Sequence, residues 1–196
     1  KGTLLVFADR PGSLEQLPDL AKRLAVVTAR VHAYLPDRLP PFGRPELRRL
    51  WRLAGEHDLA VQLHFTPEHA AGFEPLLREF KDTRVIVDHL GRPFGAPAED
   101  YDRVVRWSAL PNVVMKLSSL PAPDPPETAS LPRMVKWLAE AFGAERLIYG
   151  GGFEEKATAE SYRRERERVA ELLNFLPAEA RAHVLGGNAA RFFRFG

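Results

Sequence analysis

Short apolar stretches typical of buried strands alternate strictly with stretches of helical spacing along this chain. Each strand-like run is closed by Gly or Pro, and apolar residues three and four positions apart follow it. Strands separated by helices pair in parallel through right-handed crossovers. The sequence therefore predicts an α/β fold. Its six predicted strands are residues 3–8, 26–34, 60–65, 84–90, 112–118 and 146–149.

An acid and an imidazole stand side by side at the end of the fourth of these strands. Asp88 and His89 follow the apolar run Val85 to Val87, and Gly91 and Pro93 then end the pattern. Ionisable groups in a covered sheet are unfavourable unless they are well partnered or used. An α/β barrel carries its chemistry at this end of its strands. The alternative interpretation is that the pair only hydrogen-bonds loop backbone.

Histidines close three of the predicted strands on the same, C-terminal side. They are His32, His64 and His89, and Lys116 lies near the end of a fourth strand. A single histidine on an apolar strand is more often a satisfied core residue than a ligand. Parallel strands bring their C-terminal ends to one edge, so we expect these side chains to gather there. The sequence predicts a functional site at that edge.

Composition excludes several classes of protein. The 196 residues are 45% hydrophobic, which suits one core, and we predict a single domain over residues 1–196. No segment reaches the roughly 18 apolar residues that a membrane helix needs. The net charge is only +2, and the arginines are interleaved at helical spacing, so we expect no nucleic-acid partner. The absence of cysteine is typical of a cytoplasmic protein.

The chain begins with Lys1, and a strand pattern starts almost at once. We therefore expect residues to precede Lys1 in the native protein, so that the domain is incomplete at its N-terminus. An open sheet of six strands would leave the edges at residues 3–8 and 146–149 unpaired, and such edges invite pairing. An N-terminal segment or a second copy in a homo-oligomer would cover them.

Five stretches together resemble the amidohydrolase-2 branch of the amidohydrolase superfamily. The most specific is the motif Asp-His-Leu-Gly-Arg-Pro at residues 88–93. The resemblance spans nearly the whole chain and is nearest to lactonase-like members, which include 2-pyrone-4,6-dicarboxylate and sugar-acid lactonases. The stretches are residues 53–64, 85–93, 110–118, 142–150 and 187–192.

This resemblance implies a TIM-like (β/α)8 barrel that lacks its first two β/α units, and a hydrolase acting on a lactone or a related cyclic ester or amide. It implies that His89 and His64 are the catalytic residues. A divalent metal such as zinc is possible but is not required in lactonase-like relatives, so the metal ligands stay unassigned. The implied substrate is a small, acidic molecule. Its predicted binding residues are Arg30, His32, Arg92 and Lys116.

Two departures from the family pattern bear on activity. The chain has no His-x-His pair, which opens the first strand in relatives. Relatives also carry an aspartate after the eighth strand, where this chain has Gly152, and Glu154 or Glu155 would be its only nearby substitutes. A glycine neither binds a metal nor accepts a proton. The alternative to a hydrolase is therefore a non-catalytic relative that acts as a binding or assembly subunit.

Overall fold

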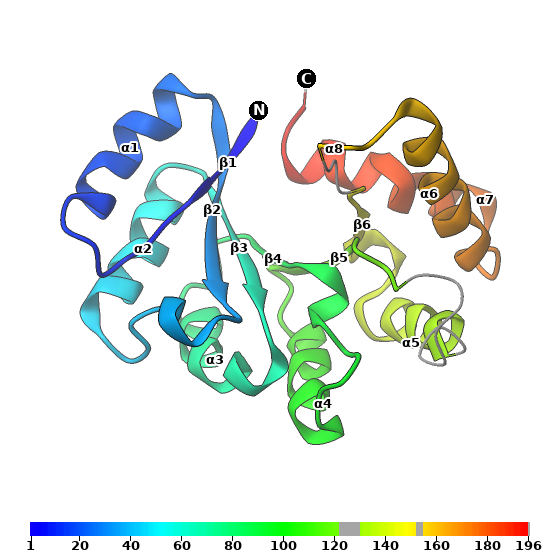
Figure 1. Ribbon diagram of the computed structural model, residues 1–196, viewed down its shortest axis with the longest axis horizontal. Coiled ribbons are helices and arrows are strands. Elements are labelled where there is room, and N and C mark those ends of the chain that lie inside the picture. Colours follow the sequence, from blue (N-terminus) through cyan, green and yellow to red (C-terminus); the bar gives the residue numbers. More distant parts are fainter. Residues whose placement is uncertain (122–129, 152–154, 196) are drawn as a thin grey trace. The chain divides into compact units, whose positions relative to one another are not determined.

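The computed structural model describes residues 1–121, 130–151 and 155–195. The chain divides into two compact units, Lys1–Val114 and Met115–Gly196, and each is considered by itself. Six parallel strands alternate with helices along the two units, in the order in which they occur in the chain (Figure 1). This confirms the α/β class that the alternating pattern predicted.

In the first unit, strands β1 to β4 pair in parallel with their neighbours in chain order. Helices α1, α2 and α3 lie along one side of these strands (Figure 1). Helix α2 is amphipathic, and Leu50 and Trp51 on its inner face are fully buried. The elements are β1 (Gly2–Leu5), α1 (Ser13–Arg23), β2 (Val26–Ala33), α2 (Pro45–Glu56), β3 (Ala60–Phe65), α3 (Ala70–Glu79), β4 (Val85–Val87) and α4 (Ala98–Arg106).

The register of these strands separates two kinds of side chain. Arg30 lies opposite Gln62, and His32 lies opposite His64. Because side chains alternate between the faces of a strand, these polar residues share one face of the sheet. The residues between them are apolar and buried on the other face, for example Val31 and Leu63. The helix-covered face thus forms the core, and the opposite face carries the polar groups.

Strand β4 is shorter than the sequence predicted. It ends at Val87, whereas the apolar pattern suggested a strand over residues 84–90. The reason lies in the backbone, because four consecutive residues from His89 to Arg92 have left-handed φ angles between 53° and 71°. A β-strand cannot contain such angles. Asp88 and His89 therefore follow the strand in a tight turn.

In the second unit, β5 pairs in parallel with β6. The side-chain amide of Asn188 donates hydrogen bonds to the carbonyl oxygens of Ala144 (2.7 Å) and Leu147 (2.8 Å), which fixes the C-terminal helices against the start of β6. The last two helices of this unit are short and are joined by a π-helical segment, His183–Gly187. The elements are β5 (Val113–Leu117), α5 (Leu131–Phe142), β6 (Leu147–Tyr149), α6 (Ala159–Leu172), α7 (Ala178–Ala182) and α8 (Asn188–Phe192).

Among the described residues, no helix combines the length and the apolar character needed to cross a bilayer.

We expect Gly91→Ala to destabilise the first unit through the turn after β4. Gly91 has φ 71°, and an added Cβ would lie 2.8 Å from Cγ1 of Val104 on α4. Left-handed strain and overpacking together should lower the free energy of unfolding by roughly 2 to 4 kcal/mol in urea titrations. Gly95→Ala is the matched control, since Gly95 has φ 81° but no atom within 4 Å. Equal losses in both variants would contradict a packing role for Gly91.

Candidate functional site

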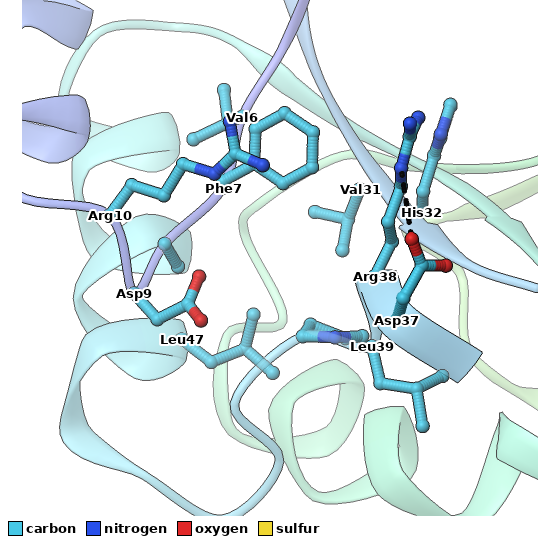
Figure 2. A pocket seen from close by; sticks show the side chains of 12 residues that line it. Val6, Phe7, Asp9, Arg10, Val31, His32, Asp37, Arg38, Leu39 and Leu47 are labelled. Carbon is cyan, nitrogen blue, oxygen red and sulfur yellow. Dashed lines mark ion pairs between the residues drawn. The ribbon is translucent and has the colours of Figure 1, made fainter. Parts of the chain in front are cut away.

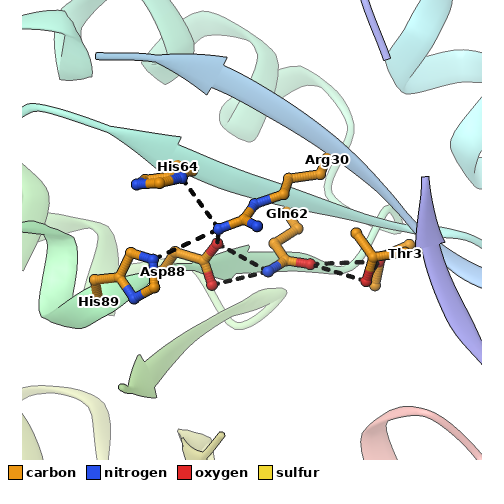
Figure 3. A network of polar contacts seen from close by, with 7 residues as sticks. Thr3, Arg30, Gln62, His64, Asp88 and His89 are labelled. Carbon is orange, nitrogen blue, oxygen red and sulfur yellow. Dashed lines mark hydrogen bonds and ion pairs between the residues drawn. The ribbon is translucent and has the colours of Figure 1, made fainter. Parts of the chain in front are cut away.

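Polar side chains from three adjacent strands meet on the helix-free face of the first unit (Figure 3). Arg30 comes from β2, Gln62 and His64 come from β3, and Asp88 and His89 follow β4. The alternation of side chains explains the grouping. Arg30 lies opposite Gln62, and His64 lies two residues after Gln62, so the three side chains point to the same face of the sheet. The cluster lies at the C-terminal end of the strands, where the sequence predicted it.

Asp88 is the centre of this cluster. Its side chain is fully buried, and its carboxylate accepts hydrogen bonds from Arg30 Nη2 at 2.8 Å and from Gln62 Nε2 at 2.9 and 2.8 Å. A buried carboxylate is tolerated only when it is paired and hydrogen-bonded in this way. Charge-assisted bonds of this kind are about twice as strong as neutral ones. The ion pair therefore fixes the position of the guanidinium.

The amide of Gln62 is itself fixed by two threonines. Thr28 Oγ1 donates a hydrogen bond to Thr3 Oγ1 at 2.6 Å, and Thr3 Oγ1 donates to Gln62 Oε1 at 3.4 Å. Thr28 Oγ1 also lies 3.3 Å from Gln62 Oε1. Because the Asp88 carboxylate only accepts hydrogen bonds, the amide nitrogen of Gln62 faces Asp88 and its oxygen faces the hydroxyl groups. The chain of contacts thus runs from β1 to the turn after β4 (Figure 3).

The neighbouring arginine determines the tautomer of His64. Arg30 Nη2 lies 3.0 Å from His64 Nδ1, and a guanidinium only donates, so Nδ1 is the acceptor. Burial, followed by the charge of Arg30, lowers the pKa of the His64 imidazole to about 3. The ring is therefore neutral near pH 7 and carries its proton on Nε2. That Nε2 atom is buried and has no hydrogen-bond partner in the described structure.

Aromatic rings continue the site beyond His64. The Tyr34 ring stacks on His64 with centroids 4.3 Å apart, and His32 meets His64 edge-on at 4.9 Å. The guanidinium of Arg92 lies over the Tyr34 ring at 4.9 Å, a cation–π contact. The rings of His64 and His89 are 4.7 Å apart. Three histidines are thus held in one contiguous group.

The turn that carries His89 is held by α4. The Tyr101 hydroxyl donates a 2.7 Å hydrogen bond to the carbonyl oxygen of Leu90. Left-handed residues other than glycine cost on the order of 1 kcal/mol or more each, and they persist where the surroundings determine them. Tyr101, buried against this turn, supplies part of that constraint.

The described residues contain one group that resembles a metal-binding set. Ligand atoms of His64, Asp88 and His89 all lie within 4.8 Å of one another. Arg30 Nη2, however, lies among them, at 2.8 Å from Asp88 Oδ2, 3.0 Å from His64 Nδ1 and 3.5 Å from His89 Nε2. A guanidinium nitrogen and a divalent cation cannot share this position. In this arrangement the residues do not fit the metal that the resemblance allows.

The structure brings together five of the six residues predicted from the sequence: Arg30, His32, His64, His89 and Arg92. Lys116 lies on β5 in the second unit, with its aliphatic chain against Gly150. Gly152 and Glu154 lie outside the described residues, so the change at the family's aspartate position stays a sequence observation.

Sequence reasoning did not identify Gln62, Thr28 or Tyr34 as part of the site. A signal was present for Gln62 and Thr28, because each lies two residues from a predicted site residue on the same strand and hence on the same face. Tyr34 lies two residues after His32, just beyond the end of β2. Uncharged residues at such positions are common, however, and their partners lie on other strands.

Comparison with known proteins gives the family and agrees with the fold. A family model described as amidohydrolase matches residues 2–195. An L-fucono-1,5-lactonase from Burkholderia ambifaria is 32% identical over 147 residues, which cover 70% of this chain and 51% of the relative. The chain thus spans about half the length of that relative.

Solved structures show the fold. A 2-pyrone-4,6-dicarboxylic acid hydrolase of Pseudomonas putida, described as putative by its crystallographers, has a TM-score of 0.77 at 22% identity and covers 100% of this chain and 72% of its own. An amidohydrolase from Burkholderia multivorans with bound zinc has a TM-score of 0.72 at 20% identity, covering 98% of this chain and 74% of its own. The predicted TIM-like architecture is thereby supported.

We expect the depressed pKa of His64 to make stability depend on pH. Unfolding returns the imidazole to a pKa near 6.5, so between about pH 3 and 6.5 the unfolded state binds more protons than the folded state. The free energy of unfolding should therefore fall as the pH drops below 6.5, by up to about 1.4 kcal/mol per pH unit. His64→Gln should flatten this slope in urea titrations, whereas the exposed His57→Gln should not. An unchanged slope in His64→Gln would contradict the assignment.

We expect Arg30→Met to open the His64, Asp88 and His89 group to zinc. The variant leaves the buried Asp88 without its cation, so it should melt at lower temperature and regain stability when zinc is added. Calorimetric titration of the native chain should show no stoichiometric zinc at this group. Arg84→Met, which removes a guanidinium bound to Asp58 elsewhere in the unit, is the control. Equally tight zinc binding by the native chain and by Arg30→Met would contradict the conclusion that Arg30 keeps a metal out of this group.

Proposed function

The chain belongs to the amidohydrolase family, and from this premise and its site we propose that it hydrolyses a lactone. In this reaction water adds to the ring carbonyl, the ring ester bond breaks, and a hydroxy acid is released. The observation that carries the proposal is the buried N–H of His64, which has no partner in the described structure and is held beside a fixed guanidinium.

His64 is suited to stabilise the oxyanion that forms at the carbonyl. Its Nδ1 is occupied by Arg30, so its Nε2 presents a hydrogen-bond donor in a site largely shielded from water. Donors that are already in place act without reorganisation, and removal of one typically costs about 10² to 10³ in kcat. The neutral state of the ring near pH 7 makes it a donor that does not itself gain or lose charge.

His89 is the candidate for proton transfer in this mechanism. Its ring lies 4.7 Å from that of His64, and it is less buried than Asp88. In the proposed step, His89 accepts the proton of the attacking water and returns it to the ring oxygen when the ester bond breaks. Asp88 is unsuited to this task, because its oxygens already accept hydrogen bonds from Arg30 and Gln62.

Positive charge near the site suits the acid that is formed. Arg30 lies beside the His64 ring, and Arg92 lies over the Tyr34 ring. The carboxylate of Asp88 is paired with Arg30. We assign Arg92 to the carboxylate that develops on ring opening, since a guanidinium binds carboxylates in a bidentate manner. Arg30, engaged by Asp88, has mainly a positioning role in this proposal.

A second candidate function is binding without turnover. It is favoured by Gly152, which stands where the family resemblance places an aspartate. In this case the chain would retain the pocket and bind a lactone or its hydroxy acid, as a binding or assembly subunit. Turnover and binding measured on the same preparation separate the two candidates.

We expect the purified chain to open at least one lactone in a panel of sugar lactones and pyrone carboxylates. The reaction is measured by titrating the released acid at constant pH. His64→Phe removes the Nε2 donor and should lower kcat about 10² to 10³-fold. Arg92→Gln should mainly raise KM, and the exposed His57→Gln is the control. Turnover that His64→Phe leaves unchanged would contradict the proposed mechanism. Binding of a panel member without turnover would instead support the second candidate.

A further inference from the structure

The hydrogen-bond donor proposed for catalysis is covered in this structure. His64 Nε2 is buried and has no partner among the described residues, so a carbonyl group reaches it only after a neighbouring side chain moves. Three aromatic rings contact the imidazole. His32 and His89 meet it nearly at right angles, with centroids 4.9 and 4.7 Å away, and Tyr34 stacks on its face at 4.3 Å. One of these three rings is therefore the cover that opens.

The backbone holds Tyr34 less firmly than the two histidines. His32 belongs to β2, where it is paired in register with β3. His89 lies in the turn after β4, and the Tyr101 hydroxyl fixes that turn. Tyr34, in contrast, follows the last residue of β2 and is half-buried. Of the three rings, Tyr34 is thus the one that is free to move.

The side chain of Tyr34 is held by ring contacts and by no hydrogen bond within the described residues. Its ring stacks on His64, lies 5.1 Å from the ring of His32, and has the guanidinium of Arg92 over it at 4.9 Å. Arg92 forms no ion pair in the same part of the chain. Stacking and cation–π contacts at partly exposed positions are individually modest. They favour the closed position without locking it.

The segment that follows Tyr34 leaves room for such a movement. Its short turn, Pro36–Arg38, contains no buried residue. Asp37 and Arg38 line a hollow of about 60 Å³ that separates this turn from Arg10 on the loop after β1 (Figure 2). Segments with few buried contacts open at a low free energy. The turn can therefore shift while the core of the unit stays intact.

We infer that the ring of Tyr34 is a gate over His64. In the closed state it stacks on the imidazole, and when it rotates away it exposes Nε2 to a substrate carbonyl. Arg92 holds the gate closed through its cation–π contact. Closure keeps water away from the donor between turnovers, as loops that cover active sites do. The use of the exposed donor rests on the proposed function, whereas the movement of the ring does not.

Solvent exchange of the His64 Nε2 proton tests the gate directly. The full chain is labelled with ¹⁵N-histidine, and the ring N–H signal that His64→Gln removes is followed by NMR near pH 7. We expect this proton to exchange roughly tenfold faster or more in Tyr34→Ala, because the cover is absent. Tyr34→Phe keeps the ring and is the matched control, with exchange within about twofold of the native rate. Equal exchange in Tyr34→Ala and the native chain would overturn the inference.

A backbone amide in the same unit serves as the internal reference. The amide of Asp88 donates a 3.0 Å hydrogen bond to the carbonyl oxygen of Leu63 on β3. Its exchange rate should not change in Tyr34→Ala, since the gate is local. Acceleration of this amide by the same factor as the His64 proton would show that the substitution loosens the whole unit, and would overturn the gate.

Kinetics on a lactone that the chain opens give a second readout. A site that is open in only a fraction of the molecules binds its substrate more weakly by that fraction. Tyr34→Ala should therefore lower KM about threefold or more. A higher KM would show that the ring binds the substrate instead of excluding it, and would overturn the inference. Faster proton exchange without turnover of any lactone would overturn the proposed function and leave the gate standing.

Discussion

The buried ion pair between Asp88 and Arg30 is the interaction on which the site depends. A carboxylate with no exposed surface needs a compensating charge and hydrogen bonds, and Arg30 and Gln62 supply both. Losing either partner of such a pair typically costs about 3 to 5 kcal/mol, because the other charge is left buried. The pair and its hydrogen bonds to Gln62 join β2, β3 and the turn after β4, so the same contacts that stabilise the sheet also place the residues proposed for catalysis.

The chemistry proposed for the site follows from that placement. Because Arg30 is held by Asp88, its Nη2 faces His64, and the imidazole stays neutral with its proton on Nε2. The guanidinium also occupies the centre of the one group of described residues that resembles a metal site. The positive charge at this position is therefore the guanidinium of Arg30, which donates hydrogen bonds from a fixed place. A site of this kind suits the opening of an ester ring.

Backbone conformation and loop position complete the arrangement. The left-handed turn at His89 to Arg92 moves two site residues out of the strand, and the Tyr101 hydroxyl holds that turn. The residues proposed for catalysis thus come from strand ends and from the turn after β4, which is the usual location of active sites in α/β barrels.

The sequence by itself determined the α/β class, the six strands and the edge at which the histidines gather, because apolar periodicity and Gly or Pro stops are local signals. The resemblance of its motifs to the amidohydrolase-2 branch also predicted Arg30, His64 and His89 as site residues. Only the tertiary structure showed that Gln62 holds Asp88, that Asp88 in turn fixes Arg30, and that β4 stops at Val87. Those facts depend on contacts between side chains that are distant in the sequence, and local sequence patterns do not specify such contacts.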